Sequence, residues 1–222
     1  MRAQNVVVSG RLARLVLAAV LATALASAAA AGCVPPDALA KRGILFRMAD
    51  GKVWHARAAG KKGVRLDQVN GKAGEDEFIE GPFGVYEVYH GHVVFKGKGR
   101  WGYIKRDFRK KPVPPVPGKG WTSRLQEDQQ SFRGGGTGPD YAAEAQYRFL
   151  PQQEVELGGC SYTVVPVEAI FTGKDENWGG MLDRSDRWLY FPDLGTGVRT
   201  MSRNSVSGEE ARAGLVAISA AP

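Results

Sequence analysis

Two histidines that flank a glycine, His90 and His92, are the closest pair of metal-competent side chains in the sequence. Catalytic zinc needs three protein ligands and an open position, so Glu80 or Glu87 would have to join them. Gly91 between the histidines is typical of a hairpin tip, and a turn there would remove the common face that alternate strand residues share. The sequence therefore favours a solvated hairpin tip, and we expect no bound metal and no cofactor.

The sequence patterns for nucleophilic catalysis and for phosphate binding are weak. There is no Gly-x-Ser-x-Gly elbow, and Cys160 lies in an alternating strand pattern with no base nearby in the sequence. The glycine-rich run 134–138 lacks the Lys-Ser/Thr ending of a P-loop. We therefore assign no catalytic residues and predict that the protein is not an enzyme.

A basic and aromatic cluster is the feature that most suggests binding. Its core is Lys98, Arg100, Trp101, Tyr103, Lys105 and Arg106, and Lys96, Arg109, Lys110 and Lys111 extend it. Cations beside aromatic rings suit phosphate-rich envelope polymers or anionic lipid head groups. The plainer interpretation is a charged edge strand that runs into a solvated linker, because such charges protect a sheet edge against pairing.

Residues 1–32 have the features of a cleaved export signal, with a basic start at Arg2, Arg11 and Arg14 and an alanine-rich stretch over 15–31. A membrane-spanning helix needs about 20 residues of stronger apolarity. The segment holds three of the 30 basic residues and none of the 23 acidic ones, so its removal lowers the net charge from +7 to +4. We therefore expect a protein of the periplasm, or of the periplasmic face of the outer membrane, that binds no nucleic acid.

Cys33 has three alternative states, since it can be a lipid attachment site, half of a disulfide or a free thiol. The run Ala30-Ala31-Gly32-Cys33 resembles the lipobox of bacterial lipoproteins, and this resemblance implies lipidation of Cys33 and a membrane anchor. Val34 in the next position implies the outer membrane within that family. The second state is a disulfide between Cys33 and Cys160, which an exported compartment permits.

Short alternating segments separated by turn residues predict an all-β fold, an antiparallel meander that forms a curved sheet, a sandwich or a half-barrel. Asp50-Gly51, Asn70-Gly71 and His90-Gly91 are predicted hairpin turns, and a parity change at Pro166 predicts a β-bulge. The predicted organisation is a signal (1–32), a tether (33–42), an N-terminal β-meander (43–107), a Pro/Gly-rich basic linker (108–138) and a C-terminal antiparallel segment (139–220).

The run from Arg187 to Gly195, Arg-Trp-Leu-Tyr-Phe-Pro-Asp-Leu-Gly, is followed by Val198-Arg199. It resembles a C-terminal signature of uncharacterised bacterial exported and lipoprotein-like β-sheet proteins, and the similarity covers 139–220. The resemblance implies a curved antiparallel sheet in the cell envelope and carries no catalytic residue to transfer. Pro192 and Gly195 also have a plain structural role, because such residues end a strand and form a turn.

These observations predict an exported cell-envelope protein, a non-catalytic binding or structural β-domain. Attachment to a membrane through Cys33 and contact with anionic envelope components are the expected interactions. A periplasmic carrier that holds a lipid or another apolar ligand in its curved sheet is the alternative, because curved sheets enclose such cargo. An envelope enzyme is the third hypothesis.

Overall fold

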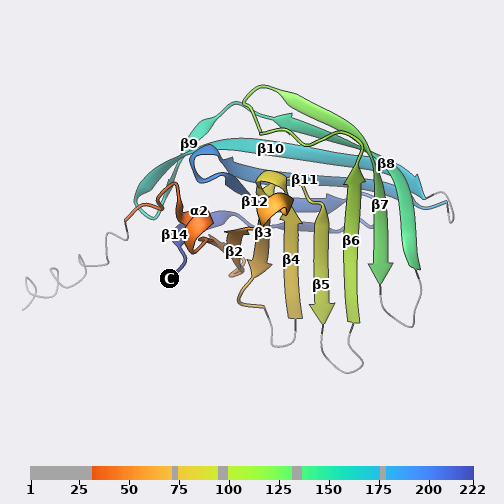
Figure 1. The fold of residues 1–222 in the computed structure, drawn as a ribbon. Coiled ribbons are helices and arrows are strands. Elements are labelled where there is room, and N and C mark those ends of the chain that lie inside the picture. Colours follow the sequence, from red (N-terminus) through yellow and green to blue (C-terminus); the bar gives the residue numbers. More distant parts are fainter. Residues whose placement is uncertain (1–31, 72–74, 95–99, 132–136, 176–178) are drawn as a thin grey trace, which may run out of the picture. The chain divides into compact units, whose positions relative to one another are not determined.

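The part of the chain that the structure describes forms one curved antiparallel sheet of 14 strands that does not close (Figure 1). This computed structural model describes residues 32–71, 75–94, 100–131, 137–175 and 179–222. The predicted all-β fold is thereby confirmed, and the architecture is the curved sheet.

The strands are β1 (Ile44–Met48), β2 (Val53–Ala58), β3 (Val64–Gln68), β4 (Glu75–Gly81), β5 (Tyr89–Val94), β6 (Arg100–Phe108), β7 (Gly120–Ser131), β8 (Thr137–Phe149), β9 (Gln153–Leu157), β10 (Cys160–Asp175), β11 (Met181–Phe191), β12 (Thr196–Asn204), β13 (Glu210–Arg212) and β14 (Leu215–Ala220). The helical elements are α2 (Ala38–Lys41) and the 3-10 turns η1 (Gly60–Lys62), η2 (Pro82–Gly84) and η3 (Pro192–Leu194). In the described residues no helix is long and apolar enough to cross a membrane.

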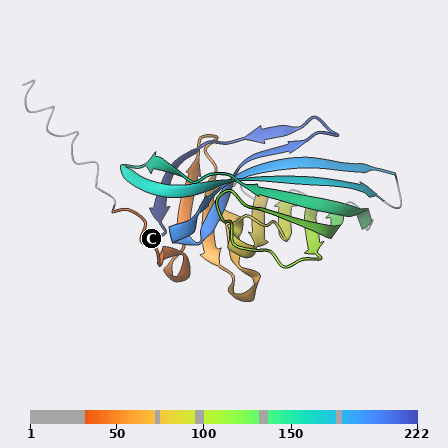
Figure 2. The same ribbon diagram turned by 90° about the horizontal axis from the view of Figure 1, so that it is seen from above.

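Most strands pair with their neighbours in the chain, in the order β13-β12-β11-β10-β8-β7-β6-β5-β4-β3-β2-β1-β14, and β9 pairs with β10 alone. The two ends of this order, β13 and β14, are separated in the chain only by Ala213 and Gly214. The C-terminal segment therefore pairs with β12 through its first residues and with β1 through its last (Figure 2).

The core lies on the concave side of the sheet, where alternate strand residues meet. Phe46 of β1, Tyr147 of β8 and Phe171 of β10 are at most 1% exposed. The connection between β4 and β5 also enters this interior, because Tyr86 packs its ring 4.6 Å from that of Tyr147 and 5.1 Å from that of Trp121. It thus touches strands from the middle of the sheet.

The predicted linker 108–138 is wrong in its second half, which contains β7. This strand pairs along both β6 and β8, so the two predicted β segments share one sheet. Trp121, Ser123 and Leu125 alternate toward the interior and are buried. The polar residues between them weaken the apolar signal, because they occupy the solvent-facing positions of the same strand.

The predicted tether 33–42 is also wrong, because this segment packs against the sheet. Val34 and Ala38 are 6% and 4% exposed. The backbone N–H of Val34 donates to the hydroxyl of Tyr162 at 3.1 Å. A short apolar segment of this kind has no periodicity from which its docking could be predicted.

The predicted hairpin at His90-Gly91 is wrong, because both residues lie inside β5, which pairs with β4 and β6. Gly91 is needed for close approach and not for a turn. A Cβ atom at this position would lie 2.1 Å from Cε1 of Phe78. His90 and His92 therefore occupy alternate positions on one face of a strand.

The turn at Asp50-Gly51 between β1 and β2 is confirmed. Residues 72–74, which follow Asn70-Gly71, lie outside the described residues. The parity change near Pro166 is present, since the buried positions shift from Val164 to Val165. The parity change is not a bulge in the β10–β11 ladder, because that ladder runs from Val165 to Lys174 without a register shift. Instead, the change marks the residue at which β10 stops pairing with β9 and begins to pair with β11.

Candidate functional site

Charged side chains occupy the middle of the interior. Five of them are at most 8% exposed: Glu87, Arg106, Glu127, Arg184 and Asp186. They come from the β4–β5 connection and from β6, β7 and β11. Buried charges are costly unless they are paired, so the contacts among these five side chains determine whether the interior is stable.

Glu87 is the centre of this buried charge network. Its carboxylate accepts hydrogen bonds from Nη1 of Arg106 and Nη1 of Arg199, both at 2.7 Å, and from Nη2 of Arg184 at 3.0 Å. These arginines belong to β6, β12 and β11, so one carboxylate joins strands from distant parts of the sheet. Burial opposes ionisation of Glu87, but the arginines and His90 outweigh burial and hold its pKa well below the usual range.

Two further carboxylates complete the pairing of the arginines. Nε of Arg106 lies 2.6 Å from Oε2 of Glu127. Nη2 of Arg184 lies 2.8 Å from Oδ2 of Asp186. The guanidinium of Arg106 also stacks 4.4 Å from the centroid of the Phe171 ring. The network is therefore paired and packed against the aromatic part of the core.

His90 connects the network to the surface. Its Nε2 lies 3.0 Å from Oε1 of Glu77, and its Nδ1 lies 3.4 Å from Oε1 of Glu87. Glu77 is in turn paired with Lys52 at 3.1 Å and lies 3.7 Å from Arg199. Burial would raise the pKa of Glu77, but the hydrogen bond and charge of His90 and the charges of Lys52 and Arg199 lower it to about 2.

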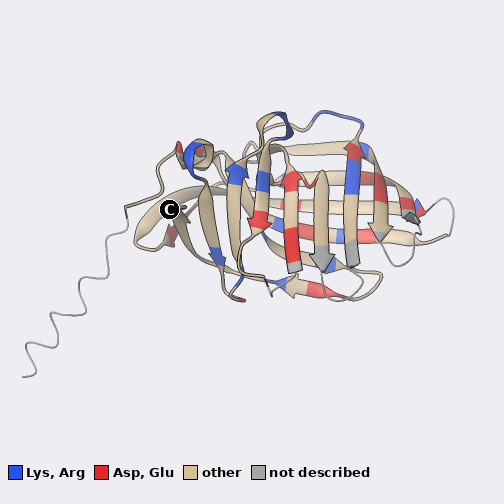
Figure 3. Cartoon of the chain, turned by 60° about the horizontal axis from the view of Figure 1, so that its bottom comes forward, with Lys and Arg blue, Asp and Glu red and all other residues tan. Residues whose placement is uncertain are grey.

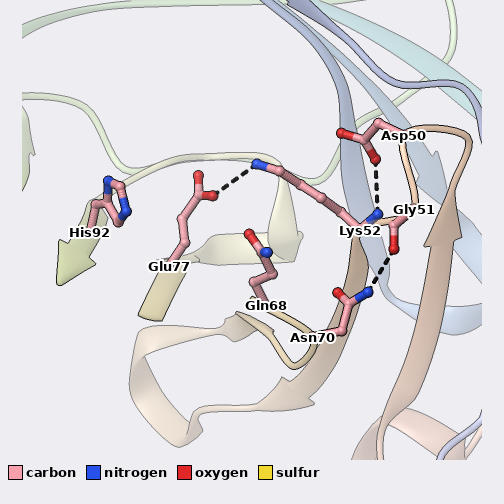
Figure 4. A pocket seen from close by; sticks show the side chains of 7 residues that line it. All are labelled: Asp50, Gly51, Lys52, Gln68, Asn70, Glu77 and His92. Carbon is pink, nitrogen blue, oxygen red and sulfur yellow. Dashed lines mark hydrogen bonds and ion pairs between the residues drawn. The ribbon is translucent and has the colours of Figure 1, made fainter. Parts of the chain in front are cut away.

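Glu77 forms part of an open depression of about 400 Å³, the polar mouth (Figure 4). The residues that line it are Asp50, Gly51, Lys52, Gln68, Asn70, Glu77 and His92. Asn70 holds the β1–β2 turn, because it donates to the carbonyl of Gly51 and accepts from the N–H of Val53. Within the described residues, the side chains of Gln68 and His92 make no hydrogen bond, so both can contact a ligand.

The protonation state of Glu77 limits the chemistry of the polar mouth. A carboxylate with a pKa of about 2 is a weak base near neutral pH and holds no proton to donate. Because Glu77 stays ionised, Nε2 of His90 is the nitrogen that donates to it. The arrangement provides a fixed negative charge, which suits binding better than proton transfer.

The predicted histidine pair is divided between two environments. His90 belongs to the interior and His92 lines the polar mouth and is exposed. In the part of the chain that the structure describes, no group of three His, Cys, Asp or Glu side chains could hold a metal ion.

The predicted basic surface is wrong at Arg106, which is 1% exposed. Its position in β6 points to the interior, where Glu87 and Glu127 neutralise its charge. Tyr103 and Lys105 are half-buried, and Lys105 pairs with Asp107 at 2.8 Å. Lys98 and the side chains of Arg100 and Trp101 lie outside what the structure describes.

Cys33 and Cys160 form a disulfide in the structure. It joins the segment before α2 to the first residue of β10. The sulfur of Cys33 is the atom that the predicted lipid thioether would use. One molecule can therefore carry the disulfide or the lipid at this position, but not both.

Sequence analysis missed the buried network, although the sequence contains a signal for it. In β11, Leu182, Trp188 and Tyr190 are apolar and buried, and Arg184 and Asp186 occupy the same parity. A charged pair on the apolar face of a long strand indicates a buried ion pair. Glu127 follows Leu125 in the same way along β7.

The fold and these contacts define an all-β domain with a curved antiparallel sheet around a buried ionic network. No protein-family profile matches the chain, and no curated protein or solved structure matches it.

The lowered pKa of Glu77 predicts a loss of stability in acid. The Glu77 carboxyl binds a proton more weakly in the folded protein than in the unfolded chain. The ionised carboxylate therefore stabilises the fold fully above pH 4.5, the ordinary pKa of Glu, and this stabilisation disappears as pH falls toward 2. We expect a loss on the order of 2–3 kcal/mol across this window. Carboxyl NMR should place the Glu77 titration near pH 2, and E77Q should flatten the acid limb of the stability curve. A Glu77 midpoint near 4.5 would contradict the assignment.

Proposed function

We propose that this protein is an exported, non-catalytic binding domain of the cell envelope whose polar mouth takes a small organic cation. The observation that carries this proposal is the pair of carboxylates in the depression, Asp50 and Glu77, of which Glu77 is kept ionised by His90, Lys52 and Arg199. Asp50 adds a second carboxylate and Lys52 the single ammonium group among the residues that line the depression. Lys52, His90 and Arg199 already neutralise Glu77, whereas Asp50 forms no ion pair within the described residues, so the charge of Asp50 is the one that favours an ammonium or guanidinium ligand.

Export is supported by the signal-like segment 1–32 and by the disulfide. Disulfides form and persist in oxidising compartments such as the periplasm and are rare in the cytosol. The Cys33–Cys160 pair therefore fits a periplasmic protein or one at the periplasmic face of the outer membrane. The resemblance of 139–220 to exported β-sheet proteins gives the same expectation.

The mass of the intact mature protein tests this part of the proposal. The disulfide form gains two hydrogens on reduction and carries no lipid. A mass increased by lipid at Cys33 would contradict the disulfide form and support the lipoprotein alternative. A mass that includes residues 1–32 after secretion would contradict cleavage of the signal.

Binding is tested by following backbone amides in an NMR titration with putrescine, with glutarate as an anionic probe of similar length. We expect putrescine to shift residues around 50–52, 68 and 77, and glutarate to shift none of them. E77Q and D50N should each weaken putrescine binding roughly tenfold, because one charge-assisted contact is lost. E156Q, which removes an exposed carboxylate from β9, is the matched control and should bind normally. Absence of shifts with putrescine would overturn the cation site.

Native mass spectrometry of the purified protein addresses the two other hypotheses. A lipid retained through purification would favour the apolar carrier. Turnover of a substrate at the polar mouth would favour an enzyme. Both functions remain predictions from the sequence.

A further inference from the structure

A second charged surface lies on the loop that follows β6 and at the start of β7. It consists of Arg109, Lys110, Lys111, Lys119 and Arg124, here called the basic rim. All five side chains are exposed, and within the described residues none of them forms an ion pair. Figure 3 shows a run of Lys and Arg in the loop that follows β6, beyond the acidic residue near the end of that strand. Their charge is therefore available to a partner.

Backbone contacts bring the basic rim together although its members span 109–124 in the chain. The N–H of Arg109 donates to the carbonyl of Arg124 at 2.9 Å. The N–H of Lys110 donates to Oγ of Ser123 at 3.0 Å. Nε1 of Trp121 donates to the carbonyl of Lys111 at 3.2 Å. The start of the loop thus lies alongside β7, and the cations form one surface.

The loop that carries the basic rim is held from inside the protein. The hydroxyl of the buried Tyr86 donates to the carbonyl of Val113 at 2.8 Å. The side chain of Pro115 is buried, and the N–H of Gly118 donates to the carbonyl of Phe149 at 2.8 Å. Four prolines between 112 and 117 further restrict the backbone. A preorganised loop loses little conformational entropy when it binds.

Two exposed apolar side chains lie in the same loop, between Lys111 and Lys119 in the chain. Val113 is 40% exposed and Val116 is 49% exposed. Exposed apolar residues surrounded by lysine and arginine are typical of surfaces that enter the interface of an anionic membrane. A soluble polyanion would contact the cations and leave the valines in water. The combination therefore favours a membrane as the partner.

We infer that the basic rim docks the domain on a membrane surface that contains anionic phospholipids, with Val113 and Val116 entering the head-group region. This inference rests on the envelope location in the proposed function and is independent of the polar mouth. The cations bind lipid phosphates, and the disulfide-linked form of the protein needs no lipid of its own at Cys33.

Sedimentation with vesicles tests this inference on the purified protein. Vesicles of phosphatidylcholine and phosphatidylglycerol in equal amounts should bind it, and pure phosphatidylcholine vesicles should not. The triple variant R109Q/K110Q/K111Q should bind roughly 100-fold more weakly, because each cation near the surface contributes about a fivefold change. The double variant V113S/V116S keeps the net charge and should bind several-fold more weakly.

The matched control is R47Q/K61Q/R203Q, which removes the same charge from exposed positions elsewhere. It should bind anionic vesicles nearly as the wild type does. Equal losses in the control and the triple variant would overturn the basic rim as the site. Unchanged binding of V113S/V116S, together with binding of soluble polyphosphate, would overturn the membrane in favour of a polyanion. If the triple variant still shows normal putrescine shifts, its loss of vesicle binding leaves the polar mouth unchanged. The vesicle experiment then tests the basic rim separately from the proposed function.

Discussion

Replacing Arg106 with methionine is expected to lower the free energy of unfolding by about 3–5 kcal/mol. Arg106 is 1% exposed, and its guanidinium neutralises Glu87 and Glu127 at 2.7 and 2.6 Å. The methionine side chain fills much of the same space but leaves Glu127 without its buried partner. Chemical denaturation followed by tryptophan fluorescence measures the loss.

Two further variants separate the network from general effects of the substitution. K105M changes the neighbouring residue, whose charge is exposed and paired with Asp107, and we expect almost no change in stability. R106M/E127M removes both members of a buried pair and should recover part of the loss, because an apolar pair no longer leaves an uncompensated charge. A small effect of R106M alone would contradict the role given to the network.

Loss of the Cys33–Cys160 disulfide has the second large effect. The bond links residues 127 positions apart. In the chain-entropy treatment, a link of this length stabilises the folded state by about 4–5 kcal/mol, because it restricts the unfolded chain. C33A/C160A should therefore unfold at a lower temperature, by about 2–4 °C for each kcal/mol lost.

Reduction provides the control for this variant. Treatment of the wild-type protein with a phosphine reductant should reproduce the loss, and the same treatment should leave C33A/C160A unchanged. If reduction does not change the unfolding temperature of the wild type, the native protein lacks the bond and Cys33 is free for lipidation. The docked segment that contains Val34 should become accessible to protease in the same experiment, because the disulfide holds it against β10.

The all-β fold was predictable because short alternating segments dominate the chain, and the turn at Asp50-Gly51 has a strong local signal. The glycine in His90-Gly91 gave the wrong prediction, since a glycine required by the Phe78 ring looks the same in sequence as a turn glycine. β7 was missed because its outward residues are polar and its inward face includes Ser123 and Glu127. Local patterns indicate which face of a strand a residue occupies, but they do not indicate which residues of distant strands pack against that face.

The candidate site was harder to predict for the same reason. Glu77 and His92 lie on neighbouring strands, but Lys52 comes from the turn before β2 and Arg199 from β12. The strand order places β12 far from β4, so the curvature of the sheet is what brings Arg199 to Glu77, and this curvature depends on packing over the whole domain. The basic cluster was predicted on β6 and the loop after it, but the parity of Arg106 in β6 was not used to place this residue inside.

The pairing of residues 210–220 with both β12 and β1 has a consequence for folding. This segment follows every other strand in the chain, and β1 gains its second neighbour only when β14 is in place. Contacts between the ends of a chain close slowly, because a long loop must be ordered first. A chain whose last residues have not yet been delivered therefore keeps β1 open on one side. In the proposed export, such a delay would let the chain cross the membrane before its sheet is complete.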